Sequence, residues 1–260
     1  MRTEAVTEAI QQVAEAEILP RFRALAAHEV IEKRPGDLVT VADRLAEKAL
    51  ADVFNAATPG CLVIGEEGIY ADPSTLSSLP EAEQAWVIDP VDGTRNFARG
   101  RADFAVMVAE VRRGVTTRGW IWQPLHDRMY VAELGAGVTC NGDPVPPAAR
   151  ERPVVGAFNN RYLSAFGRLP DDVRLVRLAG CCGVDYPDLV EGRRDFLGYW
   201  SMHPWDHLPG GLMVAETGGV LATIDGRPYT AAVKGRFLIA AADQAAWDRA
   251  AGLVRAQFQR

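Results

Sequence analysis

Acidic residues occur at three points of the chain where a short apolar run ends or begins. Glu66 follows one such run, Asp89 and Asp92 follow a second, and Asp206 precedes a third. Asp89 and Asp92 are separated only by Pro90-Val91, so their carboxylates leave a stiffened turn close together. Two adjacent carboxylates raise each other's pKa unless a cation neutralises them, and Mg²⁺ is the hard ion that prefers such oxygen ligands. The pattern therefore predicts a magnesium site.

Each cluster also has a simpler interpretation. Gly65-Glu66-Glu67-Gly68 taken alone is typical of a solvated surface turn. Asp206 taken alone would be a helix N-cap. The run from Asp89 to Thr94 is more specific, because capping aspartates do not explain an Asp-Gly-Thr sequence in which Gly93 permits close approach of the backbone.

Hydrophobic periodicity predicts the elements that must position these groups. Helical spacing indicates a helix from Val6 to about Leu25 with a break at Pro20, and a second helix over 45–54 that Thr40 or Asp43 would cap. The short apolar runs 61–64 and 86–88 read as buried strands.

The middle and end of the chain predict two further groups of elements. Four β-prone pieces at hairpin spacing suggest an antiparallel sheet: 104–111, 118–123, 128–132 and 137–140. Later strand candidates are 154–158, 175–178, 196–200, 220–223 and 237–241, with helices near 181–191, 207–217 and 243–258. The Pro-rich stretch 143–153 between the two groups predicts a boundary. We expect an N-terminal α+β subdomain over 1–145 and a C-terminal α/β subdomain over 146–260.

Composition restricts the class of protein. The 260 residues are 48% hydrophobic and 24% charged, as in a globular protein, and the net charge of -6 argues against a nucleic-acid partner or an anionic membrane surface. The four cysteines lack CxxC spacing, which predicts reduced thiols. No apolar run is long enough to span a bilayer and the first residues lack the order of a signal peptide, so we expect a cytoplasmic protein.

The acidic motifs together resemble those of a known family. Gly65-Glu66-Glu67, Asp89-Pro-Val-Asp-Gly-Thr94 and Trp205-Asp206 with Gly210 look like the three motifs of the inositol monophosphatase family, Mg²⁺-dependent and lithium-sensitive phosphomonoesterases. The segment from Lys33 to Asp43 resembles that family's lysine-to-aspartate segment, and Cys140-Asn141-Gly142 its mid-chain turn. The matches follow the family's order from about residue 33 to 222.

The resemblance implies a fold and a role for each matched residue. The fold would be a layered α/β (α+β) sandwich of the sugar-phosphatase type, with the active site between two subdomains. Glu66 and Asp89 with the Val91 carbonyl would hold one Mg²⁺, Asp89, Asp92 and Asp206 a second, and a third ion could join them. The catalytic set would be Asp43, Thr94 and Glu66, with Thr94 sharing a proton with Asp43. The substrate would contact Lys33, Asp92, Gly93, Thr94, Cys182 and Tyr199.

The implied reaction is hydrolysis of a small phosphate monoester to an alcohol and inorganic phosphate, and it is consistent with the residues. Such hydrolysis needs charge neutralisation and an activated in-line water, which paired metals supply, and it requires no Cys or His nucleophile. Inositol monophosphate is the leading substrate by resemblance. Alternatives are histidinol phosphate, then a sugar bisphosphate or a nucleotide 3′-phosphate, and last a non-catalytic regulatory relative. The partner would be a phosphorylated metabolite, and the chain would form a homodimer.

The chain departs from the family on the alcohol side of the site. Inositol-selective members carry a glutamate seven residues before the Trp-Asp aspartate, and this chain has Tyr199 there. Cys182 stands where those members have a small residue. Arg95 could contact phosphate or be a surface charge, and Arg193-Arg194 could bind an anionic group or form a solvated turn. His203 and His207 flank Asp206, yet no third ligand has zinc spacing.

Overall fold

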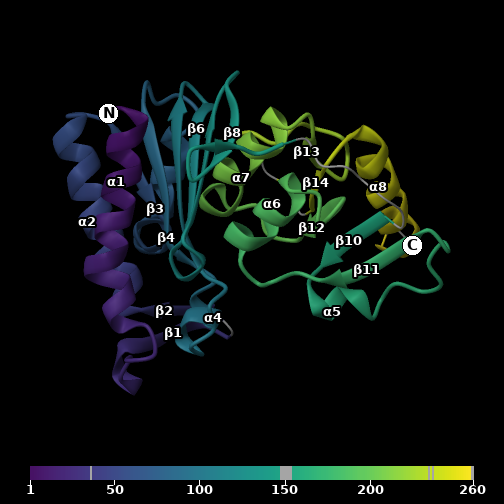
Figure 1. Ribbon diagram of the computed structural model, residues 1–260, viewed down its shortest axis with the longest axis horizontal. Coiled ribbons are helices and arrows are strands. Elements are labelled where there is room, and N and C mark those ends of the chain that lie inside the picture. The colour runs from purple at the N-terminus through teal and green to yellow at the C-terminus, as the bar shows by residue number, and fades with distance from the viewer. Residues whose placement is uncertain (36, 147–153, 234, 236, 259–260) are drawn as a thin grey trace.

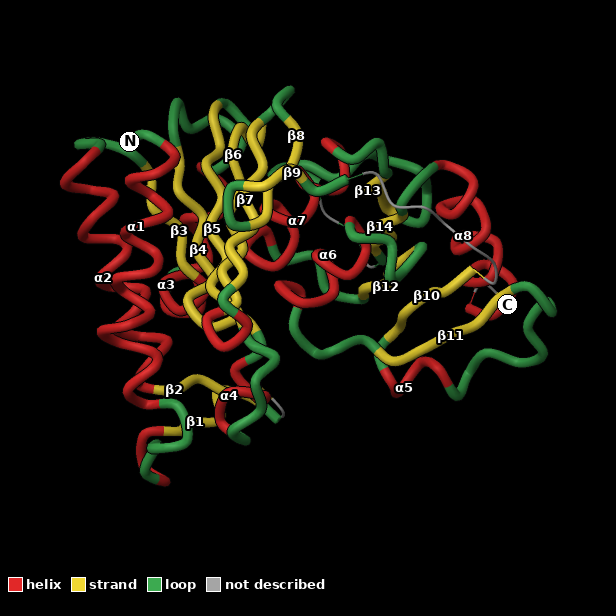
Figure 2. The backbone as a smooth tube through the Cα atoms, viewed as in Figure 1, coloured by secondary structure: helices red, strands yellow, loops and turns green. Residues whose placement is uncertain are grey.

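The chain forms alternating layers of helices and sheets (Figures 1 and 2). The computed structural model describes residues 1–260 except 36, 147–153, 234, 236, 259 and 260. Helices α1 and α2 form one outer layer, followed by a seven-stranded sheet, a layer of α6 and α7, a five-stranded sheet, and α8 on the far side. This confirms the predicted layered α/β sandwich.

The seven-stranded sheet contains the predicted antiparallel region. Its order is β3-β4-β5-β6-β7-β8-β9, with β3 and β4 parallel and every later pair antiparallel. The bounds are β3 Leu62–Gly65, β4 Ala85–Asp92, β5 Ala105–Arg112, β6 Val115–Gln123, β7 Arg128–Glu133, β8 Gly137–Cys140 and β9 Asp143–Pro144. Strand β4 is longer than predicted, because it continues through Pro90 to Asp92 with a register shift between Asp89 and Asp92.

The five-stranded sheet comes entirely from the second half of the chain. Its order is β11-β10-β12-β14-β13, in which β10 runs parallel to β11 and β12, and β14 runs antiparallel to β12 and β13. The strands are β10 Val154–Phe158, β11 Val173–Arg177, β12 Phe196–Tyr199, β13 Val220–Thr223 and β14 Leu238–Ala241. All five predicted strands are present, each within two residues of its expected start.

The helices lie close to the predicted ranges. The long ones are α1 Thr3–Val13, α2 Val41–Ala57, α6 Cys182–Val190, α7 Pro204–Glu216 and α8 Gln244–Phe258, and the short ones are α3 Glu66–Ala71, α4 Thr94–Ala98 and α5 Asn160–Leu163. The first helical segment ends at Arg21 rather than near Leu25. Pro20 is the reason, because it lacks an N–H and clashes with the carbonyl four residues earlier, and a π-helical turn over Ala14–Ile18 precedes it.

A hairpin that the sequence did not predict lies beside the site. Strands β1 Val30–Arg34 and β2 Asp37–Thr40 pair antiparallel. Four of their nine residues are charged, and the apolar residues stand next to each other instead of alternating, so the strands lack the apolar alternation that marks a half-buried strand. Thr40 ends β2 and caps α2, and Asp43 completes the capping box.

The middle helices join the two sheets. Helix α7 packs on both β6 and β13. At the contact with β6 a Cβ on Gly119 would lie 2.9 Å from the Pro209 carbonyl oxygen, so only glycine permits this approach. Most of the predicted boundary, residues 147–153, lies outside the described residues, and the division at 145/146 stays a prediction. None of the described helices combines the length and apolarity needed to cross a membrane.

Candidate active site

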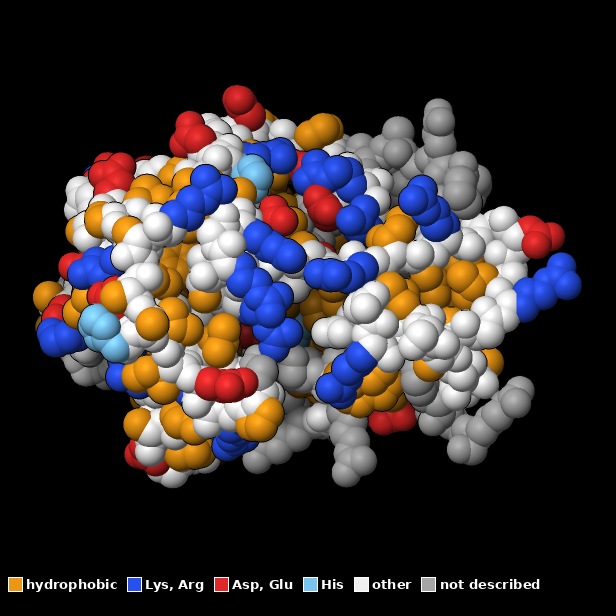
Figure 3. Space-filling model, turned by 90° about the horizontal axis from the view of Figure 1, so that it is seen from below, with side chains coloured by type: hydrophobic (Ala, Val, Ile, Leu, Met, Phe, Trp, Pro, Cys, Tyr) orange, Lys and Arg blue, Asp and Glu red, His pale blue; other side chains and the backbone are white. Residues whose placement is uncertain are grey.

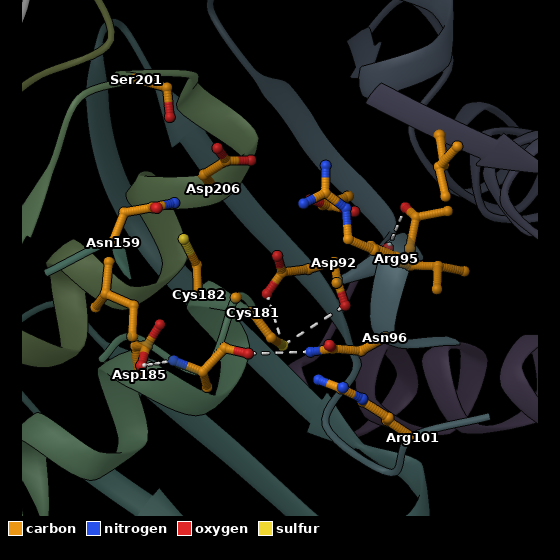
Figure 4. Close-up of a pocket in the computed structure, with 18 of the residues that line it drawn as sticks. Asp92, Arg95, Asn96, Arg101, Asn159, Cys181, Cys182, Asp185, Ser201 and Asp206 are labelled. Carbon is orange, nitrogen blue, oxygen red and sulfur yellow. Dashed lines mark hydrogen bonds between the residues drawn. The ribbon is translucent and has the colours of Figure 1, made fainter. Parts of the chain in front are cut away.

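A cavity of about 620 Å³ opens between the two sheets. It is lined by the end of β4, the start of α4, the loop after β11 and the starts of α6 and α7 (Figure 4). The predicted site residues that line it are Glu66, Asp89, Val91, Asp92, Gly93, Thr94, Cys182, Tyr199 and Asp206. Segments separated by more than 100 residues therefore meet at one place. Asp43 lies beneath the surface of the cavity, and Lys33 is not among the lining residues.

The turn after β4 is shaped by Gly93. This residue has φ +83°, a left-handed conformation that disfavours side chains. A Cβ there would lie 3.0 Å from the Asp103 carbonyl oxygen and 3.1 Å from the Cys181 Cβ. Glycine therefore allows the backbone of residues 93–94 to face the cavity while the loop before β5 and the start of α6 pack behind it.

Asp89 is one of the most deeply buried carboxylates of the cavity. It is 2% exposed, and its Oδ1 has no hydrogen-bond partner among the described residues. Burial raises the pKa of this carboxyl well above its ordinary value, and the nearby charges of Glu66, Asp92 and Asp206 raise it further. Burial also raises the pKa of Asp206, and the charge of Asp92 adds to the effect. A buried unpaired carboxylate is costly, so this cluster favours either protons or a cation.

Lys33 holds the Gly-Glu-Glu motif. Its ammonium group lies 3.0 Å from Glu66 Oε1 and 2.8 Å from Glu67 Oε1, and its side chain is only 4% exposed. Burial raises the pKa of Glu66 to about 7, although Lys33 opposes the shift. The motif thus begins α3, and its two glutamates take part in a partly buried ion-pair network instead of forming a solvated turn. Lys33, expected to contact substrate, contacts these carboxylates.

Glu47 is a residue of this region that sequence reasoning missed. Its carboxylate accepts hydrogen bonds from the backbone N–H groups of Glu67 and Gly68, both at 2.8 Å. It lies four residues after Asp43 on the same helix, so the two acids share a face of α2. That spacing was the only sequence signal for it, and it positions the start of α3.

Asp92 connects the two halves of the site. Its Oδ2 accepts hydrogen bonds from Gly183 N at 2.5 Å and from the Cys181 thiol at 3.0 Å. Cys181 is therefore a buried hydrogen-bond donor, as the dashed line in Figure 4 shows. Among the described residues, no three His, Cys, Asp or Glu side chains converge closely enough to hold one metal ion. The contacts of Asp92 help to explain why, since they direct one of its oxygens toward α6.

Asp43 and Thr94 form a hydrogen-bonded pair below the cavity. Thr94 Oγ1 lies 3.0 Å from Asp43 Oδ1 and 3.0 Å from the Val91 carbonyl oxygen. Asp43 Oδ2 accepts hydrogen bonds from Thr40 N at 2.8 Å and from Thr40 Oγ1 at 2.5 Å. Burial raises the pKa of Asp43 to about 6, although the Thr40 contacts oppose the shift. The cap of α2 thus orients the carboxyl that contacts Thr94.

Tyr199 lines the cavity and has aromatic neighbours behind it. Tyr199 is 7% exposed and stacks against Tyr186 at 5.7 Å between ring centroids, and its hydroxyl is buried with no partner among the described residues. His207 is hydrogen-bonded to the Tyr186 hydroxyl and the Ser201 carbonyl, and burial lowers the pKa of this imidazole to about 3. Asp206 lies in the first turn of α7, which begins without a side-chain cap, so the N-cap interpretation is wrong.

Arginines surround the mouth of the cavity. Arg95, Arg99 and Arg101 come from α4 and the loop that follows it, and Arg177 ends β11. All four side chains are exposed. Lys and Arg side chains gather across the middle of the face in Figure 3. By contrast, Arg193 and Arg194 form ion pairs with Asp188. Their charges are therefore compensated within the chain and do not require an anionic ligand.

The donor set of the cavity fits a hard divalent cation at Asp89. The unpartnered Asp89 Oδ1 is buried where only a proton or a cation could compensate its charge. The other available donors, Glu66, Asp206 and the Val91 carbonyl, are oxygens, which is the ligand type that Mg²⁺ prefers. A second ion at Asp89, Asp92 and Asp206 would need these three carboxylates to converge further.

The fold and site define a layered α/β protein with a carboxylate cluster between its two sheets, and comparisons identify the family. The model of the inositol monophosphatase family matches residues 2–259. Inositol-1-monophosphatase of Bacillus subtilis strain 168 is 29% identical over 209 residues, which are 76% of this chain and 77% of that protein. The chain belongs to the inositol monophosphatase family, as its motifs had indicated.

Solved structures agree with this assignment at the level of the fold. A Thermotoga maritima IMPase superposes with a TM-score of 0.84 at 23% identity and covers 99% of both chains. An IMPase/NADP phosphatase complexed with Mg²⁺ and phosphate superposes with a TM-score of 0.81 at 22% identity, covering 98% of this chain and 95% of that one.

Proposed function

We propose that this protein hydrolyses a small phosphate monoester to an alcohol and inorganic phosphate, with Mg²⁺ as cofactor and inositol monophosphate as its leading substrate. The observation that supports it most is the buried Asp89 carboxylate at the centre of the family's three acidic motifs, whose Oδ1 has no hydrogen-bond partner among the described residues. The name of the Bacillus subtilis relative favours inositol monophosphate over histidinol phosphate.

The carboxylates would hold the metal ions. Glu66, Asp89 and the Val91 carbonyl form the first proposed ligand set, and Asp89, Asp92 and Asp206 form the second. Bound Mg²⁺ ions would neutralise the phosphoryl oxygens, lower the pKa of the attacking water and stabilise the leaving oxygen. Two or three ions per site are proposed, and the Mg²⁺-phosphate complex of a protein with the same fold supports this choice of cation.

Thr94 and Asp43 would orient the attacking water and accept its proton. Thr94 has one hydroxyl proton and two acceptors within 3.0 Å, the Asp43 carboxylate and the Val91 carbonyl. When it donates to Asp43, its lone pairs are left to accept a hydrogen bond from water in the cavity. Glu66, in the proposed catalytic set, would help to hold that water. The backbone N–H groups of Gly93 and Thr94, where α4 begins, would bind the phosphate.

Two further proposals concern the location and the assembly of the protein. All four cysteines are free thiols, which supports a reducing, cytoplasmic location. We also propose a homodimer, which light scattering on the purified protein would test.

The activity is tested by phosphate release from inositol monophosphate with and without Mg²⁺. We expect turnover that requires Mg²⁺ and that chelation abolishes. Asp127→Asn is a matched control, because this exposed aspartate has φ +49°, which asparagine tolerates, and does not line the cavity. Absence of turnover with inositol monophosphate and with a panel of other phosphate monoesters would contradict the proposed function.

A further inference from the structure

The arginines at the mouth of the cavity are not explained by the chemistry above. The proposed reaction uses carboxylates, a threonine and backbone groups at the cavity floor, and it needs no guanidinium group. Arg99, Arg101 and Arg177 nevertheless line the same cavity. In the part of the chain that the structure describes, none of these three forms an ion pair with a carboxylate. Many other arginines do form ion pairs, including Arg118 with Glu110.

A buried amide ties together the two segments that carry these arginines. Asn96 is 6% exposed, and its Nδ2 donates to the Asp103 carbonyl oxygen at 2.8 Å and to the Ala179 carbonyl oxygen at 3.1 Å. Asp103 lies two residues after Arg101, and Ala179 lies two residues after Arg177. The Asn96 amide therefore links the loop after α4 to the loop after β11 at the cavity mouth and fixes their relative position. The two loops come from opposite halves of the chain.

The loop that carries Arg99 and Arg101 is itself well braced. Arg101 N donates to the Asn96 carbonyl oxygen at 2.9 Å, and Gly100 N donates to the Phe97 carbonyl oxygen at 2.9 Å. Gly100 has φ +68°, so the chain reverses between the two arginines. Figure 4 shows Arg101 on the other side of Asp92 from Asp206, at a distance from the acidic floor. Positive groups on braced backbone around an opening are preorganised for an anion.

We propose that Arg99, Arg101 and Arg177 form a subsite for a second anionic group, so that the protein also acts on phosphate monoesters that carry another phosphate and prefers at least one of them to its monophosphate counterpart. This inference rests on the proposed function, because the scissile phosphate must occupy the acidic floor. Guanidinium groups bind phosphate through paired, charge-assisted hydrogen bonds.

The test compares substrates that differ only in the second phosphate. The pairs are inositol 1,4-bisphosphate with inositol 1-phosphate, fructose 1,6-bisphosphate with fructose 1-phosphate, and adenosine 3′,5′-bisphosphate with adenosine 3′-phosphate. For each pair, kcat/KM is measured with Mg²⁺ and expressed as the ratio of bisphosphate to monophosphate. We expect a ratio of about ten or more in at least one pair, as a charge-assisted hydrogen bond would produce.

Three variants separate binding from long-range attraction. Arg101→Ala and Arg177→Ala should each reduce the ratio severalfold toward one. Arg101→Lys keeps the positive charge but loses the planar guanidinium group and its paired hydrogen bonds. It should therefore also reduce the ratio, whereas the ratio would stay unchanged if the arginine acted only by long-range electrostatic attraction. Arg174→Ala is the matched control, because this exposed arginine lies on the same strand as Arg177 and does not line the cavity. It should keep the wild-type ratio.

The outcomes distinguish the two proposals. Hydrolysis of monophosphates with a ratio near one in every pair would overturn the subsite and leave the proposed function intact. A high ratio that persists in Arg101→Ala and Arg177→Ala would also overturn it, as would a high ratio that persists in Arg101→Lys. Absence of turnover with every substrate would overturn the proposed function and the subsite together.

Discussion

Two sides of the cavity differ in how their polar groups are held: the acidic floor, where we propose that the phosphate binds, and the side at Tyr199, where we propose that the alcohol binds. Below they are called the phosphate side and the alcohol side. On the phosphate side, Asp43 is oriented by Thr40, and Asp92 by Gly183 and Cys181. On the alcohol side, the Tyr199 hydroxyl has no partner among the described residues. One group on the phosphate side, Asp89 Oδ1, also lacks a partner, and it lies where we propose a cation.

This difference separates turnover from selectivity. Groups that the protein already holds are in place before the substrate arrives, so changes to them should affect the rate of the chemical step. Polar groups without protein partners can be satisfied only by a ligand, so changes to them should affect binding of that ligand, which we propose is the catalytic cation at Asp89 and the substrate at Tyr199. Four predictions test this contrast.

Asp89→Asn should have the largest effect. Removing the charge at the centre of the proposed metal sites should cost several kcal/mol of catalysis, or roughly 10³-fold or more in Mg²⁺-dependent phosphate release. The chelator-treated variant should melt at the same temperature as wild type or higher, because a buried carboxyl that its neighbours repel has been removed. Turnover within about tenfold of wild type would show that the metal assignment is wrong.

Thr94→Ala should lower kcat by about 10²- to 10⁴-fold while Mg²⁺ affinity changes little, because the hydroxyl is proposed to pass a proton to Asp43. Thr94→Ser, which keeps the hydroxyl, is the matched control. Asp43→Asn should resemble Thr94→Ala, and the double variant should lose little more than either single variant, because the two residues act as one unit. Additive losses in kcat would rule out the relay.

Chelator-treated protein should lose stability as pH rises. Burial raises the folded-state pKa of Asp43 to about 6 and that of Glu66 to about 7, above their ordinary values of 3.8 and 4.5. These two carboxyl groups therefore bind more protons in the folded chain than in the unfolded chain between about pH 4 and 7, and their contribution to the free energy of unfolding falls as pH rises through that window. Melting temperatures from pH 5.5 to 8 measure this effect.

Added Mg²⁺ should stabilise the folded chain most at the alkaline end of this range, where the carboxylates are ionised. A melting temperature of the chelated protein that rises steadily from pH 5.5 to 8 would contradict the electrostatic description of the phosphate side.

Tyr199→Phe should have the smallest effect, and it tests the alcohol side. Loss of one neutral hydrogen bond to the substrate should raise KM for inositol monophosphate by roughly 2- to 12-fold and leave kcat nearly unchanged. Removing a buried, unpartnered hydroxyl should not destabilise the protein. An unchanged KM would show that this hydroxyl does not contact the substrate.

The sequence by itself determined the local structure and the type of chemistry. Strand and helix periodicities span short windows, so β3, β5 and α7 could be located from neighbouring residues alone. The Asp89-to-Thr94 motif also lies within one window, so its carboxylates, glycine and hydroxyl were expected at the same place.

Only the tertiary structure decided which distant groups meet. Lys33 contacts Glu66 across 33 positions, Cys181 contacts Asp92 across 89, and Asn96 contacts Ala179 across 83. The geometry of these contacts depends on the path of the chain and on the packing of α6 and α7 between the sheets. A periodicity in neighbouring residues carries no information about that path, because it reports only the face that each element buries.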